Sequence, residues 1–493
     1  NGAGIARDLA GRGVRVVLCE QHDLAAHTSS ASTKLIHGGL RYLEYYEFAL
    51  VRKALAEREV LLRSAPHLTW PLRFVMPHDP SMRPVWMIRA GLFLYDHLAR
   101  RTWLPGSQAV NLRTHVAGAP LQPQWHTGFV YSDAWVDDAR LVVLNAVDAA
   151  ARGATVLTRT TCVAAQRAGT HWLAQLQPVG AGPLTVRARA LINATGPWAA
   201  QFLGTQLGEA HHAALRLVKG SHIVVPRLFT HDQAYLFQSP DRRIVFALPY
   251  EHDYTLIGTT DVEEHGPPGA ALVSDDEVAY LCAQVSRYFA QPVRPADVVW
   301  RYCGVRPLLD DAGDPSALTR DYRLALDTAD GHAPLLTVWG GKITTFRRLA
   351  EEAADLLRAP LGLRAAHWTH DALLPGGDLS PWVGAPQRPD HDFARFVQAL
   401  QQRHPAFAPA LLLRWARAYG ARIGPLLAAP PGDEVAPGLY EAELDYLHRE
   451  EWARSATDVL WRRSKLGLHY TPAQRDAVAQ WCVAHWGAPP DAV

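Results

Sequence analysis

Hydrophobic and polar positions alternate with two different periods along the first part of the chain. Ile5 and Leu9 stand four residues apart within residues 2–12, a spacing that predicts the buried face of a short helix. The apolar run at residues 14–19 predicts a buried strand. The same alternation recurs further along, with helices predicted over 45–64 and 139–152 and strands over 154–158 and 186–193. This pattern is typical of α/β proteins.

The pattern changes near residue 215. Between 215 and 260 the apolar runs are short and rich in β-formers, which predicts an antiparallel sheet in a separate domain. A strand at 335–339 leads into a helix near 346–358, and a plausible linker follows at 374–377. Beyond the linker we predict helices over 391–403, 407–420, 438–450 and 472–486.

Length and composition place the chain among ordinary globular proteins. Its 493 residues suggest about three domains, and 20% charged and 48% hydrophobic residues exclude bulk disorder. The net charge of +1 argues against a generally cationic nucleic-acid-binding protein. Five scattered cysteines without a CxxC pair predict neither a disulfide framework nor a metal site. There is no apolar run of 18 residues and no visible secretory signal.

The first thirty residues contain part of a dinucleotide-binding pattern. Gly2 and Gly4 open the predicted helix, and Glu20 ends the strand that follows it. Glu20 lies 18 residues after Gly2, close to the spacing at which an acid reaches a ribose hydroxyl. The helix N-terminus would present N–H groups to a pyrophosphate. Taken alone the pattern is weak, because glycines between a helix and a strand are common in α/β proteins.

Residues 28–42 (TSSASTKLIHGGLRY) form an unusually polar, glycine-containing segment. Hydroxyls, including those of Ser29 and Ser30, suit a loop around phosphates and a planar ring, and Gly38-Gly39 permits close approach of a ligand to the backbone. His37 and Arg41 stand four residues apart and could present a proton carrier and an anion clamp together. The alternative is a serine-rich surface loop before a helix.

Three further motifs contain turns, and two of them also carry a cation. Residues 193–198 (NATGPW) place Gly196 in a strand-to-turn element. Arg306 precedes a proline in an extended segment, which suits bidentate recognition of phosphate or carboxylate. Residues 340–344 (GGKIT) open a helix whose N–H groups, with Lys342, could stabilise negative charge on a reduced flavin. Each of the last two could instead be a turn with a surface cation.

Taken together, these residues resemble the FAD-dependent glycerol-3-phosphate dehydrogenase family, and its bacterial aerobic, membrane-associated members most closely. The resemblance covers essentially the whole chain, with long motifs in order and at the right spacing. The segments that carry it are 28–51, ALAEREVLL (54–62), YSDAWVDDARLV (131–142), NATGPW (193–198), KGSHIVVP (219–226), IGTTDVE (257–263), GVRPL (304–308), TRDY (319–322), GGKITTFRRLAE (340–351), YEAELDYL (440–447) and LWRRSKLG (460–467).

The resemblance implies a mixed α/β fold in three parts. A discontinuous Rossmann-like FAD-binding domain would comprise 1–70, 128–212 and 315–362. An interleaved antiparallel-sheet substrate domain would comprise 71–127 and 213–314, and an all-α C-terminal domain 375–493.

The resemblance also implies oxidation of sn-glycerol 3-phosphate to dihydroxyacetone phosphate, with FAD taking the hydride from C2 and a membrane quinone taking the electrons. By position, His222 is the first choice of base and His37 the second, with Lys342 beside the flavin or substrate. The residues expected to bind the substrate are Arg306, Arg320, Arg41, Tyr42 and Thr259. Those expected to line FAD are Gly2, Gly4, Glu20, Ser29, Ser30, Lys34, Gly38, Gly39, Gly196, Gly341 and Thr344.

Charge is segregated along the chain, and this bears on the expected partners. Residues 34–120 carry 12 Lys/Arg against 6 Asp/Glu, whereas 251–300 carry 2 against 9. Residues 83–103 combine aromatic residues with arginines, which predicts an interfacial basic helix on an anionic membrane surface. The alternative is a core helix with a basic end. We expect a peripheral protein on the cytoplasmic face of the inner membrane, ubiquinone or menaquinone as acceptor, a possible homodimer and no nucleic acid.

The sequence departs from the family at its N-terminus. The family's first strand and first two fingerprint glycines are absent from this sequence, so we expect the 493-residue polypeptide to bind FAD poorly. Competing functions are an amine or amino-acid oxidase of the same fold, a glycerol-phosphate oxidase that uses oxygen, and a non-catalytic remnant. The motifs at 304–307 and 319–322 and the C-terminal helices favour the phosphate enzyme.

Overall fold

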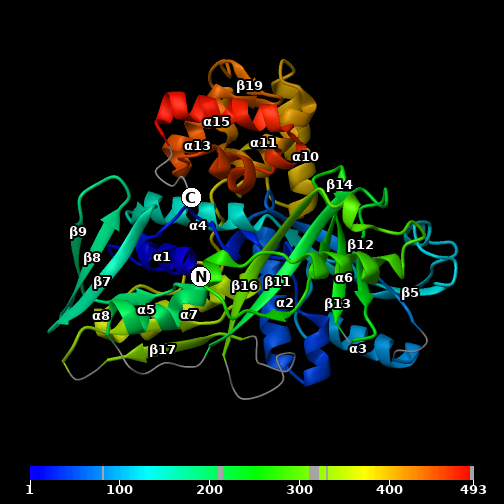
Figure 1. Cartoon of the computed structure of the whole chain (residues 1–493), viewed down its shortest axis with the longest axis horizontal. Helices are drawn as coiled ribbons and strands as arrows, with labels where there is room; N and C mark the ends of the chain where they lie inside the picture. The colour runs from blue at the N-terminus through cyan, green and yellow to red at the C-terminus, as the bar shows by residue number, and fades with distance from the viewer. Residues whose placement is uncertain (80–82, 209–214, 242, 310–320, 329–330, 489–493) are drawn as a thin grey trace.

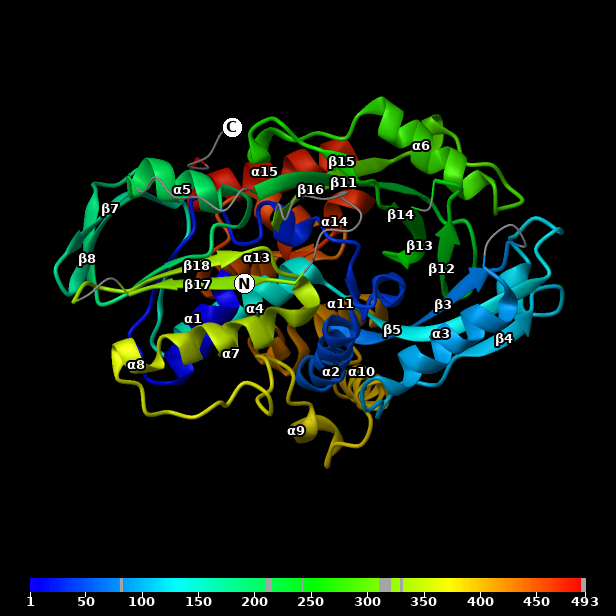
Figure 2. The same ribbon diagram turned by 90° about the horizontal axis from the view of Figure 1, so that it is seen from below.

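The computed structural model describes residues 1–79, 83–208, 215–241, 243–309, 321–328 and 331–488. An α/β part containing both α1 and β7–β9 lies beside a large sheet that includes β11–β14, and a helical group lies against both (Figure 1). Figure 2 shows β7 and β8 at one end of the molecule and β3–β5 at the other.

The α/β part is built around two short parallel strand pairs, β1 with β6 and β10 with β18. Its elements are α1 (Gly2–Gly11), β1 (Val17–Cys19), α4 (Asp138–Ala151), β6 (Thr155–Leu157), β10 (Leu191–Asn193), α5 (Ala199–Gln206), β17 (Arg323–Asp327), β18 (Leu335–Trp339), α7 (Phe346–Leu356) and α8 (Arg358–Leu361). Helix α1 packs against α4 and α7. The predicted helical face is confirmed, because Ile5 and Leu9 are buried against Leu336, Val338 and Leu349.

A small antiparallel sheet adjoins this part, with strand order β7–β8–β9. Its strands are β7 (Thr160–Ala168), β8 (His171–Pro178) and β9 (Leu184–Ala188). The single strand predicted over 186–193 is wrong, since the chain there forms the end of β9 and then β10. β9 pairs with β8 and β10 pairs with β18, so one β-rich run serves two different sheets.

The large sheet is mixed, and all its strand pairs are antiparallel except β12 with β3. Its main path through the described residues is β15-β11-β14-β13-β12-β3-β5-β2, with β16 on β11 and β4 on β5. The strands are β2 (Leu35–Ile36), β3 (Thr69–Pro77), β4 (Gln108–Asn111), β5 (Thr127–Val136), β11 (Leu215–Pro226), β12 (Ala234–Gln238), β13 (Ile244–Tyr250), β14 (Tyr254–Gly258), β15 (Val262–Glu263) and β16 (Trp300–Leu309). The antiparallel strands predicted over 215–260 are therefore confirmed.

Helices cover both faces of the large sheet. They are α2 (Phe48–Ser64), α3 (Val85–His97) and α6 (Asp275–Ser286). Ile223 and Val225 point to the core that contains α6, whereas Val224 points to the core that contains α2 and α3. This alternation follows from the two-residue period of a strand and explains why β11 is apolar on both faces.

The C-terminal part is mainly helical, as predicted, with one small hairpin that the sequence did not predict. Its elements are α9 (Ser380–Val383), α10 (Pro389–Arg403), α11 (Pro409–Tyr419), α12 (Gly424–Leu427), β19 (Glu434–Ala436), β20 (Leu439–Tyr440), α13 (Glu441–Glu451), a π-helical turn (Asp458–Arg463), α14 (Leu466–His469) and α15 (Pro472–Trp486).

Buried ion pairs join the C-terminal part to the α/β part. Arg463 donates to both oxygens of Asp23 at 2.6 and 2.8 Å. Arg140 of α4 pairs with Glu451 of α13. Because unpaired charges are very costly in a protein interior, these contacts fix the helical part against the loop that follows β1.

Candidate active site

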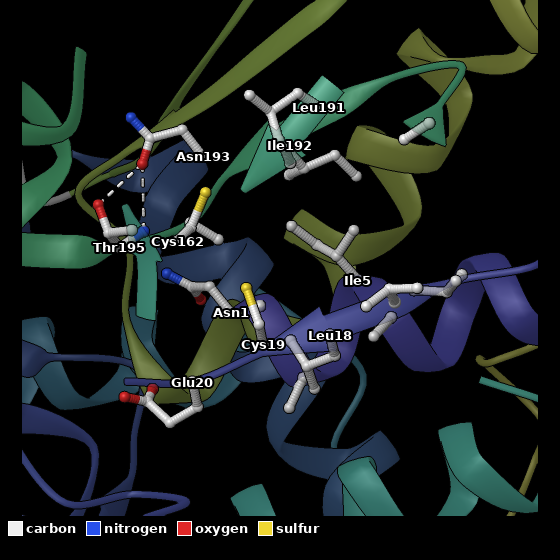
Figure 3. Close-up of a pocket in the computed structure, with 18 of the residues that line it drawn as sticks. Asn1, Ile5, Leu18, Cys19, Glu20, Cys162, Leu191, Ile192, Asn193 and Thr195 are labelled. Carbon is white, nitrogen blue, oxygen red and sulfur yellow. Dashed lines mark hydrogen bonds between the residues drawn. The ribbon is translucent and has the colours of Figure 1, made fainter. Parts of the chain in front are cut away.

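A cavity of about 930 Å³ separates the two parallel strand pairs of the α/β part. β1 and the segment before it line one wall and β10 lines the other (Figure 3). Within the described residues β1 pairs only with β6, and β10 only with β18, so each has one edge without a ladder partner. The side chains of Cys19 and Cys162 also line the cavity (Figure 3).

The carboxyl ends of these strands and the N-terminus of α1 meet at the same cavity. Gly2, Glu20, Ser29 and Gly196 all line it. Asn193 ends β10, and its Oδ1 accepts hydrogen bonds from the Thr195 hydroxyl at 2.8 Å and the Thr195 N–H at 3.4 Å (Figure 3). Strand carboxyl ends beside a helix N-terminus are the arrangement in which α/β proteins bind dinucleotides.

Glu20 occupies the position expected of a ribose-binding acid. It directly follows β1, and its Oε1 accepts a hydrogen bond from the His22 N–H at 3.0 Å. Burial raises the pKa of Glu20, and that backbone N–H opposes the shift. An acid held in this way can accept hydrogen bonds from a diol at the cavity edge.

The polar segment 28–42 passes between the cavity and the large sheet. The Thr28 hydroxyl donates to the Val305 carbonyl of β16 at 2.8 Å, and the segment continues past Ser29 and Ser30. Lys34 is 1% exposed, and its Nζ lies 2.7 Å from Asp138 Oδ2. The ammonium is therefore directed to the N-terminus of α4, and it anchors the segment there.

Gly38 lies beside a buried carboxylate, Asp133, whereas Gly39, with φ +77°, lies against the Tyr42 ring. The Gly38 N–H donates to the Tyr95 hydroxyl at 2.9 Å, and that hydroxyl donates to Asp133, whose Oδ2 lies 2.8 Å away. Arg58 Nη1 completes the group at 2.7 Å from Asp133. A Cβ at Gly38 would lie 2.7 Å from the Tyr95 oxygen, so the close backbone approach needs glycine there.

The segment 340–345 closes against both α1 and residues 37–42. Lys342 Nζ lies 3.8 Å from the centroid of the Tyr42 ring. The His37 N–H donates to Thr344 Oγ1 at 3.3 Å. A Cβ at Gly341, where φ is +110°, would lie 2.5 Å from Asn1 Nδ2. The structure therefore brings together the residues that the sequence predicted from 37–42 and 341–344.

Arg306 lies on β16, over the backbone of β11. Its Nη2 donates to Thr259 Oγ1 at 3.0 Å, and its Nη1 pairs with Asp261. A Cβ at Gly220 would lie 2.3 Å from Arg306 Nη2, so that glycine leaves room for the guanidinium. The Arg306 side chain keeps 27% exposure, which leaves it accessible to an anion.

His222 lies on the same face of β11 and β16. The pairing register sets His222 opposite Tyr302 and Val218 opposite Arg306. The imidazole is buried and stacks on Tyr302, with ring centroids 4.9 Å apart, and its Nε2 lies 2.9 Å from Thr33 Oγ1. Burial, then the charges of Arg306 and Lys34, lower the pKa of His222 well below its usual value, so the ring is neutral at neutral pH.

The remaining predicted residues lie away from these groups. Gly4 faces α7, where a Cβ would lie 2.8 Å from the Phe346 ring. Arg41 Nη2 donates to the Tyr45 hydroxyl at 3.2 Å on the exposed side of its turn. Arg320 lies outside the described residues.

Comparison with known proteins identifies the chain's family. The family model described as "FAD dependent oxidoreductase" matches residues 1–347. The chain belongs to this family. It is therefore an FAD-dependent oxidoreductase, with the α/β fold and the cofactor that the sequence motifs predicted.

Curated relatives extend the match beyond that model. A glycerol-3-phosphate dehydrogenase of Pseudomonas aeruginosa is 50% identical over 487 residues, covering 98% of this chain and 93% of the relative. A D-erythritol 1-phosphate dehydrogenase of Brucella abortus is 48% identical over 488 residues, covering 98% and 95%. Among solved structures, the glycerol-3-phosphate dehydrogenase of Bacillus halodurans complexed with FAD gives a TM-score of 0.76 at 25% identity, covering 98% of this chain and 88% of that one. The predicted resemblance is confirmed.

The residues present fit FAD. The N-terminus of α1 can donate to phosphate oxygens, and Glu20 can accept from a ribose. The Ser29 hydroxyl and the turn at Gly196 line the same cavity. The segment 340–344 lies against α1 and offers N–H donors at the start of α7, which suits the negative edge of a reduced ring.

Two carboxylates in the site, Asp133 and Asp261, were not predicted from the sequence. Asp133 lies within the apolar run of β5. A charged residue in such a run indicates a buried ion pair, here with Arg58, so the sequence did contain a signal for it. Asp261 stands in the IGTTDVE segment, and its pairing with Arg306, 45 residues away, left no local signal.

Proposed function

We propose that this chain oxidises sn-glycerol 3-phosphate to dihydroxyacetone phosphate and passes the electrons to a membrane quinone. The observation that carries the proposal is one face of β11 and β16, where an accessible guanidinium, Arg306, stands near a neutral imidazole, His222. The residues that flank this face, Thr28 and Thr33, belong to the segment that borders the cofactor cavity. The activity for which the glycerol-3-phosphate dehydrogenase relatives are named agrees with this substrate.

Arg306 would bind the phosphate. Its planar fork matches two phosphate oxygens, and its present partners, Asp261 and Thr259, hold it over Gly220. A dianion would compete with the Asp261 carboxylate for the same N–H groups. Phosphate binding energy would then orient C2, which raises the rate as well as the affinity.

His222 would accept the C2 hydroxyl proton. A general base must be unprotonated, and burial keeps this imidazole neutral. Its Nδ1 has no hydrogen-bond partner among the described residues, whereas Nε2 is positioned by Thr33. When bound, FAD supplies the acceptor for the hydride that leaves C2. Lys342, close to the start of α7, would add positive charge beside the ring.

Turnover of three substrates tests the proposal. The full chain, with FAD added in excess, is assayed with an artificial dye acceptor on glycerol 3-phosphate, D-erythritol 1-phosphate and glycerol, and separately on amines and amino acids. We expect reduction with glycerol 3-phosphate, formation of dihydroxyacetone phosphate and no turnover of glycerol. Preference for D-erythritol 1-phosphate would instead assign the activity for which the Brucella abortus relative, a D-erythritol 1-phosphate dehydrogenase, is named. Turnover of an amine or amino acid in place of both phosphates would contradict the proposal.

The membrane contact is proposed on α3 and the turn before α2. Trp86, Phe93 and Tyr46 are 67%, 65% and 79% exposed, and Arg89 and Arg100 form no ion pair with any described residue. A hollow of about 510 Å³ beside them is lined by Arg52, His97, Arg100 and Arg101, among others. Exposed aromatic rings beside arginines suit the interface of an anionic bilayer. Figure 1 places α3 at the periphery, on the side away from α10–α15.

None of the helices within the described ranges is long and apolar enough to cross a bilayer. Co-sedimentation with vesicles containing phosphatidylglycerol tests the proposed contact. A Trp86→Ser, Phe93→Ser double variant should remain in the supernatant. Leu272→Ser, at an exposed apolar position outside this surface, should sediment like the parent. Equal sedimentation of all three proteins would reject the surface.

Quinone reduction measured against hydrogen peroxide yield would separate a quinone from oxygen as the acceptor.

A further inference from the structure

The loop between β14 and β15 presents its side chains alternately to two sides. Thr259 and Asp261 both contact Arg306. Thr260, between them, turns the other way and donates from its hydroxyl to Glu277 Oε1 at 2.8 Å. A hydrogen bond that holds Thr260 in place therefore also fixes Thr259 and Asp261, the two partners of Arg306.

Glu277, on α6, accepts hydrogen bonds from β11 and from the loop between β14 and β15, beneath the substrate face. Its Oε1 also accepts from Ser221 Oγ at 2.7 Å, and its Oε2 lies 3.0 Å from Lys219 Nζ. The Ser221 N–H donates to Thr260 Oγ1 at 2.9 Å, which ties β11 to the loop. Glu277, Ser221 and Thr260 are 6%, 0% and 1% exposed, so water does not compete for these bonds.

The neighbours of this group are the proposed substrate residues. Ser221 stands between Gly220, which lies under the Arg306 guanidinium, and His222. Thr260 stands between Thr259 and Asp261. The Glu277 carboxylate therefore bonds to Ser221, which is adjacent to His222, and to Thr260, which is adjacent to both partners of Arg306. These bonds lie on the side of the sheet opposite the proposed substrate face.

Glu277 also completes the N-terminal cap of α6. Its Oε2 accepts from the Ser274 N–H at 3.0 Å, and its own N–H donates to Ser274 Oγ at 3.2 Å. Such a capping box accounts for one carboxylate oxygen only. The hydroxyls of Ser221 and Thr260 bond to the other oxygen, so a helix cap alone does not explain the group.

We propose that Glu277 is a positioning residue for phosphate recognition: through Thr260 and Ser221 it fixes the loop that orients Arg306 and the strand that carries His222. The proposal rests on the assignment of Arg306 as the phosphate ligand. It adds to that assignment a residue that does not touch the substrate, on a helix from the opposite face of the sheet.

Variants can separate the positioning role from the capping role. Glu277→Gln removes the charge that gathers the four donors, and Thr260→Val removes the link to the loop while leaving the cap. Ser274→Ala weakens the cap while leaving the hydroxyls of Ser221 and Thr260 bonded to Glu277. The probe is inorganic phosphate, titrated calorimetrically into the full chain with FAD added in excess.

We expect Glu277→Gln and Thr260→Val each to raise the phosphate Kd and the KM for glycerol 3-phosphate about five- to tenfold, with a smaller change in kcat. The double variant should resemble the single ones, because both remove the same link. Ser274→Ala should lower the Tm and leave the phosphate Kd unchanged. Circular dichroism checks that each variant is folded.

An unchanged phosphate Kd in Thr260→Val and Glu277→Gln would overturn the inference, as would an equal rise in Ser274→Ala. The failure of the proposed function is a different result. A parent chain that binds phosphate but oxidises neither phosphate substrate would contradict that function, while the Kd values of the variants would still decide the role of Glu277.

Discussion

At the residue scale, the cations of the site were predictable and their partners were not. Arg306 and Lys34 stand in recognisable local patterns, so the sequence indicated anion-binding roles for both. The structure pairs them with Asp261 and Asp138, which are 45 and 104 residues away. Pairings at that separation depend on the fold, and no periodicity along the chain encodes them.

Replacement of Arg306 tests the phosphate assignment. Arg306→Ala should lower kcat/KM for glycerol 3-phosphate by at least about tenfold, equivalent to about 1.4 kcal/mol. Arg306→Lys should retain part of the activity, since it keeps the charge but loses the fork. Steady-state kinetics with dye reduction measures both. A smaller loss in the alanine variant would remove Arg306 from the phosphate site.

Replacement of His222 tests the base. His222→Ala should slow anaerobic flavin reduction by about 10²- to 10⁴-fold, the usual contribution of general base catalysis. Stopped-flow absorbance follows the reduction, and the flavin content of each preparation serves as the control. A near-normal rate would exclude His222 and leave His37 as the candidate.

At the element scale, most helices and strands followed from periodicity, and the errors have physical causes. The run at 186–193 contains no glycine or proline to mark a break, but its partners change from β8 to β18 between Ala188 and Leu191. Partner exchange leaves no trace in side-chain alternation. The strand Leu35–Ile36 was not predicted, because two residues are too few to show a period. Helices α10 and α11, which carry apolar stripes, were correctly predicted, and so was α15, although it buries only Val478 and Cys482.

The junction after α2 should make the fold sensitive to acid. His67 is fully buried, and a Cβ at Gly376 or Gly420 would lie 3.3 or 2.9 Å from its ring. Burial, helped by Arg140 and Arg417, lowers the pKa of His67 to about 3. The unfolded chain takes up a proton below about pH 6.5 and the native state does not, so stability falls as the pH falls, by about 2 kcal/mol at pH 5.

Thermal unfolding of His67→Gln checks this expectation. The Tm of the variant should fall less between pH 7 and pH 5 than that of the parent. His391→Gln, at an exposed histidine, should follow the parent. Parallel curves for all three proteins would show that His67 is not the acid-sensitive group.

At the scale of the whole molecule, the C-terminal helices hold the nucleotide-binding side together. Asp23 lies three residues after Glu20 and receives Arg463, and Asp458 receives Arg159. Burial raises the pKa of Asp23, whereas the charges of Arg463 and Arg462 lower it. The net effect is a lowered pKa. This contribution to stability is therefore complete at neutral pH and is lost only as the pH falls below about 4.

Removal of one partner should affect stability and cofactor affinity together. Arg463→Met leaves the Asp23 carboxylate buried without its main cation, a change that costs about 3–5 kcal/mol. The Tm should fall and the Kd for FAD should rise, because the loop after Glu20 loses its anchor. Arg449→Ala, in an exposed pair with Glu450, should change neither. An unchanged FAD affinity in Arg463→Met would show that the helices support only their own fold.

The two cysteines that line the cofactor cavity have a consequence for oxidative inactivation. Burial, with the neighbouring Cys162, raises the pKa of Cys19 to about 12, and burial raises the pKa of Cys162. Peroxide and alkylating reagents attack the thiolate, and almost none is present at neutral pH. Peroxide released by a redox reaction in this cavity would therefore meet protonated thiols and almost no thiolate that it could oxidise. Iodoacetamide should leave both residues unmodified until the protein unfolds.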